Sequence, residues 1–289
     1  MTILLAAIKA MRPKQWVKNV FLFAALIFAR KFMEIESWTQ VILGFIAFCF
    51  VSSSGYIFND ARDRKADAKH PKKKFRPIAA GDLPLSVAYV EMLLLLALGI
   101  TVGYFVSPMF LVLLLAYYVN TMSYSFYFKN FAILDVMFIA MGFLWRVAAG
   151  AVAISVDPSP WLLMCTGFFA LFLGFNKRRG EMLLVDGSET RKNLKEYNLE
   201  MVTEFQAITT SGTIISYALY TVENNHWLLF TVPHVLYAVF RYIYLVTEFN
   251  EGGAPDETLL KDTPILLTGL LYIITVLAVL IFAPIAPSI

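Results

Sequence analysis

Residues 38–58 read WTQVILGFIAFCFVSSSGYIF, and residues 59–67 continue as NDARDRKAD. The first stretch has the length and apolar character of a helix that crosses a bilayer, which takes about 20 residues. The second stretch places three aspartates, Asp60, Asp63 and Asp67, directly after that helix. An apolar span that ends in a cluster of acids predicts a membrane protein whose polar chemistry lies at one membrane face.

The composition of the whole chain also indicates a membrane protein. Of its 289 residues, 59% are hydrophobic and 16% are charged, and the mean hydropathy is +0.67. A soluble domain has about 45–50% apolar and about 25% charged residues. These values exclude a disordered chain or a disulfide scaffold and argue against a soluble enzyme. The two cysteines, Cys49 and Cys165, lie in apolar runs and are predicted to be buried.

Working outward from residues 38–58, we predict nine membrane-spanning helices. They cover residues 17–33, 38–58, 85–106, 108–127, 132–155, 160–176, 205–223, 227–246 and 264–285. The alternating hydrophobicity of outer-membrane barrels is absent from the sequence. The predicted fold is therefore all-α: an integral membrane bundle of nine transmembrane helices, forming one domain over residues 1–289.

The basic residues predict the orientation of this bundle. Of the 24 Lys and Arg residues, 20 fall on one side when the nine predicted spans are threaded through a bilayer. Because basic residues accumulate on the cytoplasmic side, we expect the N-terminus and the candidate active site in the cytosol. The C-terminus is expected outside, and the protein in the plasma (inner) membrane.

Two predicted cytoplasmic loops, residues 59–84 and 177–204, are long and dense in charge of both signs. Long connections in compact proteins are often functional. The alternative interpretation is that these loops are solvated and bind lipid headgroups through their basic residues.

The spacing of the acids in the first loop suggests a metal site. If the helix continues past residue 58, positions 59, 63 and 67 share one face, with Asp60 beside them. Carboxylates that lie so close repel one another, and Mg²⁺, which prefers oxygen ligands and substrate phosphates, relieves the repulsion. A basic run at 72–76 follows. The alternative is that the aspartates pair with neighbouring basic residues in water, and spacing alone does not decide between the two.

The pattern NDxxDxxxD at 59–67, followed by RPIxxG at 76–81, resembles the first aspartate-rich motif of the UbiA superfamily of intramembrane prenyltransferases. Members of that superfamily have nine transmembrane helices. The resemblance covers nearly the whole chain and implies a Mg²⁺–diphosphate site at the cytosolic end of the bundle. It implies catalytic roles for Asp60, Asp63, Asp67 and Asp135, and metal ligation by Asn59 together with the first three of these.

The sequence departs from aromatic prenyltransferases of that superfamily at one position. Their second motif, DxxxD, corresponds here to Asp135-Val136-Met137-Phe138-Ile139, so an isoleucine replaces the second aspartate. Other motifs are prominent instead: RPKQWVKN at 12–19, Tyr124 with Lys129, GFLWR at 142–146, and KRRGE at 177–181. This set resembles the branch that transfers 5-phosphoribose from phosphoribosyl diphosphate to a polyprenyl (decaprenyl-type) phosphate.

Two anionic substrates require many cations, and the chain supplies them. The expected substrate-binding residues are Lys18, Asn19, Lys73, Lys74, Arg76, Tyr124, Lys129, Arg146, Lys177, Arg178 and Arg179. Arg146 lies within a predicted span, where an arginine normally faces the interior of the bundle. Because positions 135 and 146 are three turns apart, we expect Asp135 and Arg146 on one helix face.

The expected reaction needs metal and electrostatic catalysis but no general base, because the acceptor phosphate is already an anion. Two alternatives stay open: an aromatic prenyltransferase that uses an isoprenyl diphosphate, and a transporter. Ile139 and the excess of cations count against the first, and the one-sided ionisable clusters count against the second. The expected partners are the two substrates and the bilayer, with no nucleic acid. The sequence leaves open whether the chain forms a homo-oligomer.

Overall fold

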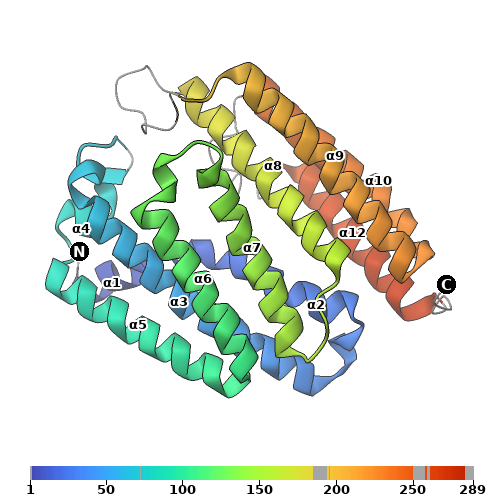
Figure 1. Ribbon diagram of the computed structural model, residues 1–289, viewed down its shortest axis with the longest axis horizontal. Coiled ribbons are helices and arrows are strands. Elements are labelled where there is room, and N and C mark those ends of the chain that lie inside the picture. Colours follow the sequence, from blue (N-terminus) through green and yellow to red (C-terminus); the bar gives the residue numbers. More distant parts are fainter. Residues whose placement is uncertain are drawn as a thin grey trace. The chain divides into compact units, whose positions relative to one another are not determined.

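The computed structural model describes residues 2–71, 73–184, 194, 196–249, 258 and 261–283. Within these ranges the chain forms helices and turns and no strand, which confirms the all-α prediction (Figure 1). The chain divides into two compact units: Met1–Phe128 with Met141–Pro158, and Lys129–Ala140 with Ser159–Ile289.

The first unit contains these elements: α1 (Ile3–Ala10), η1 (Pro13–Leu22), α2 (Phe23–Phe28), η2 (Lys31–Met33), α3 (Ile35–Asp67), η3 (Lys73–Phe75), α4 (Pro77–Ala80), α5 (Leu85–Val106) and α6 (Pro108–Phe126). After η4 (Phe128–Asn130), α7 (Leu134–Ala153) contributes residues to both units. The second unit continues with α8 (Pro160–Leu184), α9 (Leu199–Asn224), η6 (His226–Thr231), α10 (Val232–Glu248) and α12 (Thr263–Phe282).

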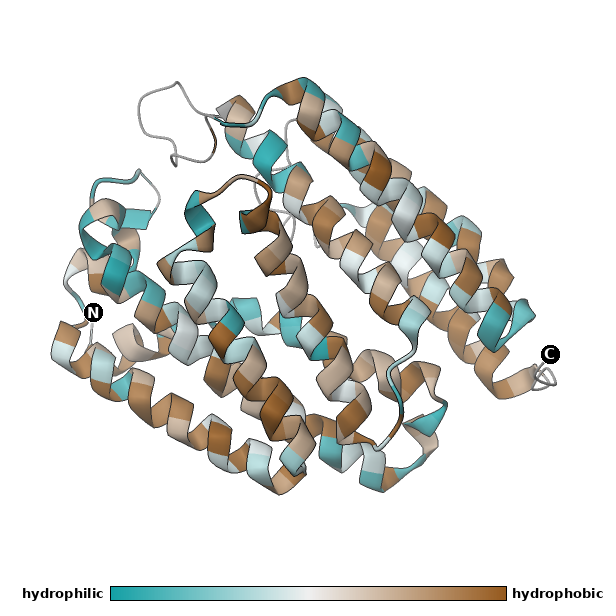
Figure 2. Ribbon diagram, in the orientation of Figure 1, coloured by the Kyte–Doolittle hydropathy of each residue, from teal (hydrophilic) through white to brown (hydrophobic). Residues whose placement is uncertain are grey.

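Six helical segments in the described ranges are long and apolar enough to cross a membrane: α3, α5, α6, α7, η6 with α10, and α12. They coincide with six of the nine predicted spans. Large apolar side chains of α5 and α12 are exposed along the helix length, as expected for surfaces that meet lipid. The ribbon of α5 is mainly brown in Figure 2, the colour of hydrophobic residues. The helices α8 and α9 coincide with predicted spans 160–176 and 205–223 but are more polar, so their crossing stays a prediction.

The predicted helix at 17–33 is wrong as a single helix. The chain forms a ten-residue 3-10 helix, η1, then the short α2, a turn at Arg30 (φ 58°) and η2. The segment nevertheless runs along roughly the first half of α3: Trp16 Nε1 donates to Ser53 Oγ (3.0 Å), and Trp38 Nε1 donates to the Phe32 carbonyl (2.8 Å). A 3-10 helix rises about 2.0 Å per residue, so fewer residues cover the same thickness.

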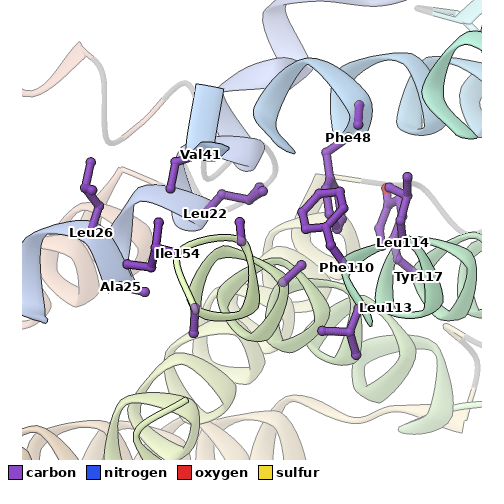
Figure 3. Close-up of a cluster of buried hydrophobic side chains, with 14 of the residues drawn as sticks. Leu22, Ala25, Leu26, Val41, Phe48, Phe110, Leu113, Leu114, Tyr117 and Ile154 are labelled. Carbon is purple, nitrogen blue, oxygen red and sulfur yellow. The ribbon is translucent and has the colours of Figure 1, made fainter. Parts of the chain in front are cut away.

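A buried apolar cluster joins η1, α2, α3, α6 and α7 in the first unit (Figure 3). Phe48 of α3 packs edge-on against Phe110 of α6, with ring centroids 5.9 Å apart. On α7, Gly150 abuts the Leu22 backbone: a Cβ added there would lie 2.8 Å from the Leu22 Cα. The lack of a side chain at Gly150 therefore permits a close approach of α7 to the end of η1.

In the second unit, α8 and α9 pack side by side (Figure 1). Two buried amides join them, because Gln206 donates a hydrogen bond to the Asn176 side chain. An ion pair joins α10 and α12: Nη2 of Arg241, in the middle of α10, lies 2.9 Å from Oδ2 of Asp262, directly before α12. Asp262 also caps α12, accepting a hydrogen bond from the Ile265 N–H (3.0 Å).

The Asp262 carboxylate gives the second unit a pH-dependent contact. The hydrogen bond from Arg241 holds the pKa of Asp262 below its ordinary value. A carboxylate with a lowered pKa stabilises the fold above its unfolded-state pKa and loses that effect as the pH falls through the folded value. Asp262→Asn keeps a good N-cap but removes the charge.

We therefore expect Asp262→Asn to lower the Tm in detergent by about 1–3 °C at pH 7. The difference should shrink as the pH falls below about 4, where the unfolded carboxyl becomes protonated. Thermal unfolding of both proteins across this pH range measures it. A difference that stays constant with pH would contradict the assignment.

Candidate active site

The last two turns of α3 carry the aspartates predicted from the sequence. Asp60 and Asp67 are buried and Asp63 is half-buried. The helix continues without interruption through these residues, so spacings of three and four place the carboxylates on neighbouring positions of one face. We call Asp60, Asp63 and Asp67 the aspartate cluster. Asn59, the fourth predicted ligand, is half-buried beside it.

Two arginines compensate the charge of this cluster. Arg76 Nη1 lies 2.9 Å from Asp60 Oδ1 and 2.6 Å from Asp67 Oδ2, so it bridges the two buried carboxylates. Arg12 pairs with Asp60 from the N-terminal segment. Arg12 has a left-handed backbone (φ 55°) directly before Pro13 and η1, a conformation that non-glycine residues rarely adopt. The first unit therefore folds its N-terminus and the 73–76 segment onto the same helix end.

Arg12 was missed as a site residue in the sequence analysis. The available signal was its position at the start of the RPKQWVKN motif, but nothing in the sequence indicates that residues 48 positions apart meet. For Asp60 and Asp67, the alternative of pairing in water with their immediate neighbours is not what the described contacts show, because both buried carboxylates pair with Arg76. Arg62 instead donates to the Phe126 carbonyl (3.1 Å) at the end of α6 and lies over the Phe126 ring.

The donor set of the aspartate cluster suits a hard divalent cation, because carboxylate and amide oxygens are the ligands that Mg²⁺ prefers. In the described residues, no three acid, histidine or cysteine side chains lie close enough together to hold a metal ion. The side chains of Arg12 and Arg76 are each 25% exposed. A metal site at this helix end therefore requires two changes: the carboxylates have to draw together, and the arginines have to exchange them for another anion.

The remaining predicted residues of the first unit lie at several places. Lys73 and Lys74 form η3, directly before Arg76, with the Lys74 ammonium over the Phe75 ring. Lys18 is half-buried on η1, and Tyr124 is half-buried near the end of α6. Lys72, which belongs to the same basic run, lies outside the described residues.

Arg146 and Asn19, both predicted from the sequence, are brought together. Arg146 is buried, and its Nε donates to Asn19 Oδ1 (2.8 Å). Its other hydrogen bonds go to the Gly142 carbonyl (2.8 Å) and to Tyr117 Oη (2.9 Å). Within the described part of the chain no carboxylate pairs with Arg146, whose guanidinium lies over the Tyr117 ring at 4.5 Å. The arginine thus ties α7 to η1 and α6.

This geometry predicts that Arg146→Lys destabilises the first unit. Lysine keeps the charge but cannot reproduce a planar guanidinium that donates in three directions and stacks on an aromatic ring. We expect a loss of about 1–3 kcal/mol, since buried acceptors lose their donor. Thermal unfolding in detergent measures it, with the exposed Arg64→Lys as matched control. Equal Tm values for the two variants would contradict the structural role.

Asp135 lies at the start of α7 and belongs to a cluster in the second unit. Asp135 and Arg178 are fully buried, and Arg178 Nε lies 2.7 Å from Asp135 Oδ2, as an ion pair without hydrogen-bond alignment. Arg178 Nη1 also pairs with Glu181. Tyr197 Oη donates to Asp135 Oδ1 (2.8 Å). We call Asp135, Arg178, Glu181 and Tyr197 the α7–α8 cluster.

The predicted loop 177–204 has different bounds. The helix α8 continues to Leu184, so Lys177, Arg178 and Arg179 are helical, and α9 begins at Leu199. Arg179 donates to the Val246 carbonyl (3.0 Å) near the end of α10. Charged side chains made this stretch resemble a loop, but their contacts with α7 and α10 stabilise the helix. Residues 185–193 of the predicted loop lie outside the described residues.

The other predicted residue of the second unit, Lys129, is half-buried in η4. Tyr197 occurs in the second loop of the sequence, yet its contact with Asp135 joins positions 62 residues apart and could not be predicted from spacing.

Comparison with known proteins identifies the class. Residues 20–256 match the UbiA prenyltransferase family, and the chain belongs to that family. It is 33% identical to the decaprenyl-phosphate phosphoribosyltransferase of Corynebacterium glutamicum, over 96% of this chain and 87% of the relative. It is 30% identical to the enzyme of the same name from Mycolicibacterium smegmatis, over 96% of this chain and 92% of the relative.

The fold has solved counterparts. A UbiA homologue from Archaeoglobus fulgidus bound to GPP and Mg²⁺ superposes with a TM-score of 0.74 at 18% identity, over 95% of this chain and 99% of the other. A structure of a digeranylgeranylglyceryl phosphate synthase superposes with a TM-score of 0.69, also at 18% identity, over 97% of this chain and 98% of the other. At this identity the similarity establishes the UbiA fold, and the chain is a multi-pass membrane protein of an enzyme family.

Proposed function

We propose that the chain transfers 5-phosphoribose from phosphoribosyl diphosphate to a polyprenyl phosphate of the decaprenyl type and releases diphosphate. The observation that carries the proposal is the aspartate cluster with Arg12 and Arg76, which combines oxygen ligands for a metal with cations for a diphosphate. The choice of donor and acceptor rests on relatives of that activity, which are similar over nearly the full chain. The product leads toward polyprenyl-phosphoryl arabinose and cell-envelope glycans.

In the proposed reaction, the bond between C1 of the ribose and the diphosphate oxygen breaks, and an oxygen of the lipid phosphate forms a bond to C1. Asp60, Asp63 and Asp67, with Asn59, would hold Mg²⁺. Mg²⁺ bound there supplies charge neutralisation for the leaving diphosphate. The acceptor phosphate is an anion before attack, so no side chain has to remove a proton from it.

Arg12 and Arg76 have a second role in this proposal. Both guanidinium groups present several donors in a fixed plane, which suits the oxygens of a phosphate. When the carboxylates bind metal, the arginines turn to the diphosphate, and each anion keeps a cationic partner. The positions support this exchange, since both side chains reach the cluster from outside α3 and are partly exposed.

The other predicted ligands remain proposals for the phosphate of the ribose and of the lipid. They are Lys18, Lys73, Lys74, Tyr124, Lys129, Lys177 and Arg179. Arg146 and Asn19 support the first unit, and Arg178, which is buried against Asp135, supports the second. The polyprenyl tail would enter between helices from the bilayer. The exposed side chains on α5 and α12 are largely apolar, so an apolar tail can pass along them without contacting charged groups.

We also propose nine crossings, with the N-terminus in the cytosol and the C-terminus outside. The clustering of 20 of 24 basic residues on one side supports it. Single cysteines placed at each end, in a background without Cys49 and Cys165, can be labelled in intact cells with a membrane-impermeant maleimide. Labelling is expected at the C-terminus alone, and labelling at the N-terminus alone would invert the topology.

The activity test uses purified protein, Mg²⁺, labelled phosphoribosyl diphosphate and decaprenyl phosphate. A labelled lipid is expected, and EDTA should abolish it. A second arm offers geranyl diphosphate with an aromatic acceptor. Transfer in the second arm alone would establish an aromatic prenyltransferase and overturn the proposal.

A further inference from the structure

We propose that the aspartate cluster of α3 alone binds metal, and that Asp135 is a positioning residue that holds Arg178 in place of a metal ion. The inference rests on the proposed function, because it assigns the metal ion of that reaction to one group of carboxylates and an arginine to the other. Ile139 occupies the place of the second aspartate of the DxxxD pattern, so Asp135 has no second carboxylate of that motif beside it in the sequence.

The two sites differ in how available their carboxylates are. In the aspartate cluster, the pairing arginines are 25% exposed and can exchange partners with a ligand from solution. In the α7–α8 cluster, the side chains of Arg178 and Asp135 are 1% and 0% exposed. Both carboxylate oxygens of Asp135 have partners: Oδ2 the guanidinium and Oδ1 the Tyr197 hydroxyl. A divalent cation would have to displace a fixed buried cation, so this carboxylate does not fit a metal.

The backbone just before Asp135 is constrained by the same contacts that hold the Asp135 carboxylate. Ile133, two residues earlier, has a left-handed conformation (φ 67°), which is strained for a β-branched residue. Its N–H donates to Tyr197 Oη (2.6 Å), and the same hydroxyl donates to Asp135. Strained backbone persists where surrounding contacts enforce it, often at functional sites.

Tyr197 stays a donor throughout the working pH range, because burial raises the pKa of its phenol above the ordinary value. One hydroxyl therefore fixes both the start of α7 and the carboxylate that pairs with Arg178. Through Arg178, this arrangement fixes the basic turn of α8 at 177–179. The inferred role of Asp135 is to orient that turn.

The first experiment is a double-mutant cycle on stability. Removing one partner of a buried ion pair leaves an uncompensated charge, whereas replacing both is far less damaging. We expect Asp135→Asn and Arg178→Gln each to lower the Tm in detergent by about 5 °C or more, and the double variant to recover at least half of that loss. A double variant no more stable than the worse single variant would overturn the pairing.

The second experiment separates pairing from metal ligation. Mn²⁺ is titrated into each purified variant with inorganic diphosphate, and bound metal is followed by electron paramagnetic resonance. Because Asp135 is not a ligand, the half-saturating Mn²⁺ concentration should change by less than about twofold in the double variant, while Asp63→Asn should raise it by about tenfold or more. A similar increase in both would overturn the inference.

These measurements also distinguish the inference from the proposed function. Neither the double-mutant cycle nor the Mn²⁺ titration needs turnover. An absence of phosphoribosyl transfer would therefore overturn the proposed substrates and leave both measurements valid. If Asp135→Asn does not fold, the double variant and Tyr197→Phe, which removes only the hydroxyl donor to Asp135, still report on the cluster. Tyr197→Phe is expected to lower the Tm and leave Mn²⁺ binding unchanged, and weaker Mn²⁺ binding would count against it.

Discussion

Asp63→Asn is expected to reduce phosphoribosyl transfer by at least about 10²–10³-fold, the scale of losing one electrostatic contributor to a transition state. Asparagine has the same shape but no charge, and Asp63 lies between the two buried carboxylates of the cluster. The cluster would lose one of its three negative charges and hold a divalent ion more weakly. The loss arises when charge develops on the leaving diphosphate, so it should appear mainly in kcat.

Initial rates at saturating phosphoribosyl diphosphate and increasing Mg²⁺ measure this effect. Asp157→Asn is the matched control, because Asp157 is exposed in the connection between α7 and α8 and outside the cluster. The control should retain the wild-type rate. Transfer by Asp63→Asn within a few-fold of wild type would mean that the cluster does not hold the metal.

Gly150→Ala is expected to prevent correct folding of the first unit. The added Cβ would lie 2.8 Å from both the Cα and the carbonyl carbon of Leu22. These are backbone atoms of η1, so no side-chain rotation relieves the clash, and one helix must move. Overpacking costs about 1–3 kcal/mol in ordinary cores and more where the backbone has to shift. Displacing η1 would also disturb Asn19, which accepts the hydrogen bond from Arg146.

Fluorescence-detected size exclusion in detergent measures the folded fraction, and thermal unfolding measures any surviving protein. Gly269→Ala is the matched control: Gly269 lies within α12, and an added Cβ would meet nothing within 4 Å. Alanine is the better helix former by about 1 kcal/mol, so the control should fold normally. A normal elution profile and Tm for Gly150→Ala would show that η1 does not pack against α7 as described.

The sequence predicted those elements that local pattern determines. The span at 85–106 has the same bounds as α5, because a mostly apolar run lies between Pro84 and Ser107-Pro108. The aspartate cluster was predicted because helical spacing alone places its members together. Both signals lie within one continuous helix, where periodicity is informative.

Other features depend on contacts between distant segments. The 3-10 helix at residues 13–22 ends against Gly150, which lies far along the chain, and local pattern does not reveal this contact. The pairing of Asp135 with Arg178 depends on how far α8 extends beyond residue 176. The sequence shows which residues can carry charge or allow close packing, but it does not show which distant residues they contact. The site residues could therefore be predicted, and their partners could not.

The arginines that bridge the aspartate cluster have a consequence for binding in salt solution. A ligand that enters an open basic patch releases small ions, and its affinity falls steeply with ionic strength. Here Arg12 and Arg76 are paired before any ligand arrives. Under the proposed function, binding of a metal diphosphate would exchange one set of ion pairs for another and leave the number of exposed charges nearly constant. The affinity for the donor should therefore depend only weakly on ionic strength, and the enzyme would keep its donor in cytosols of different salt content.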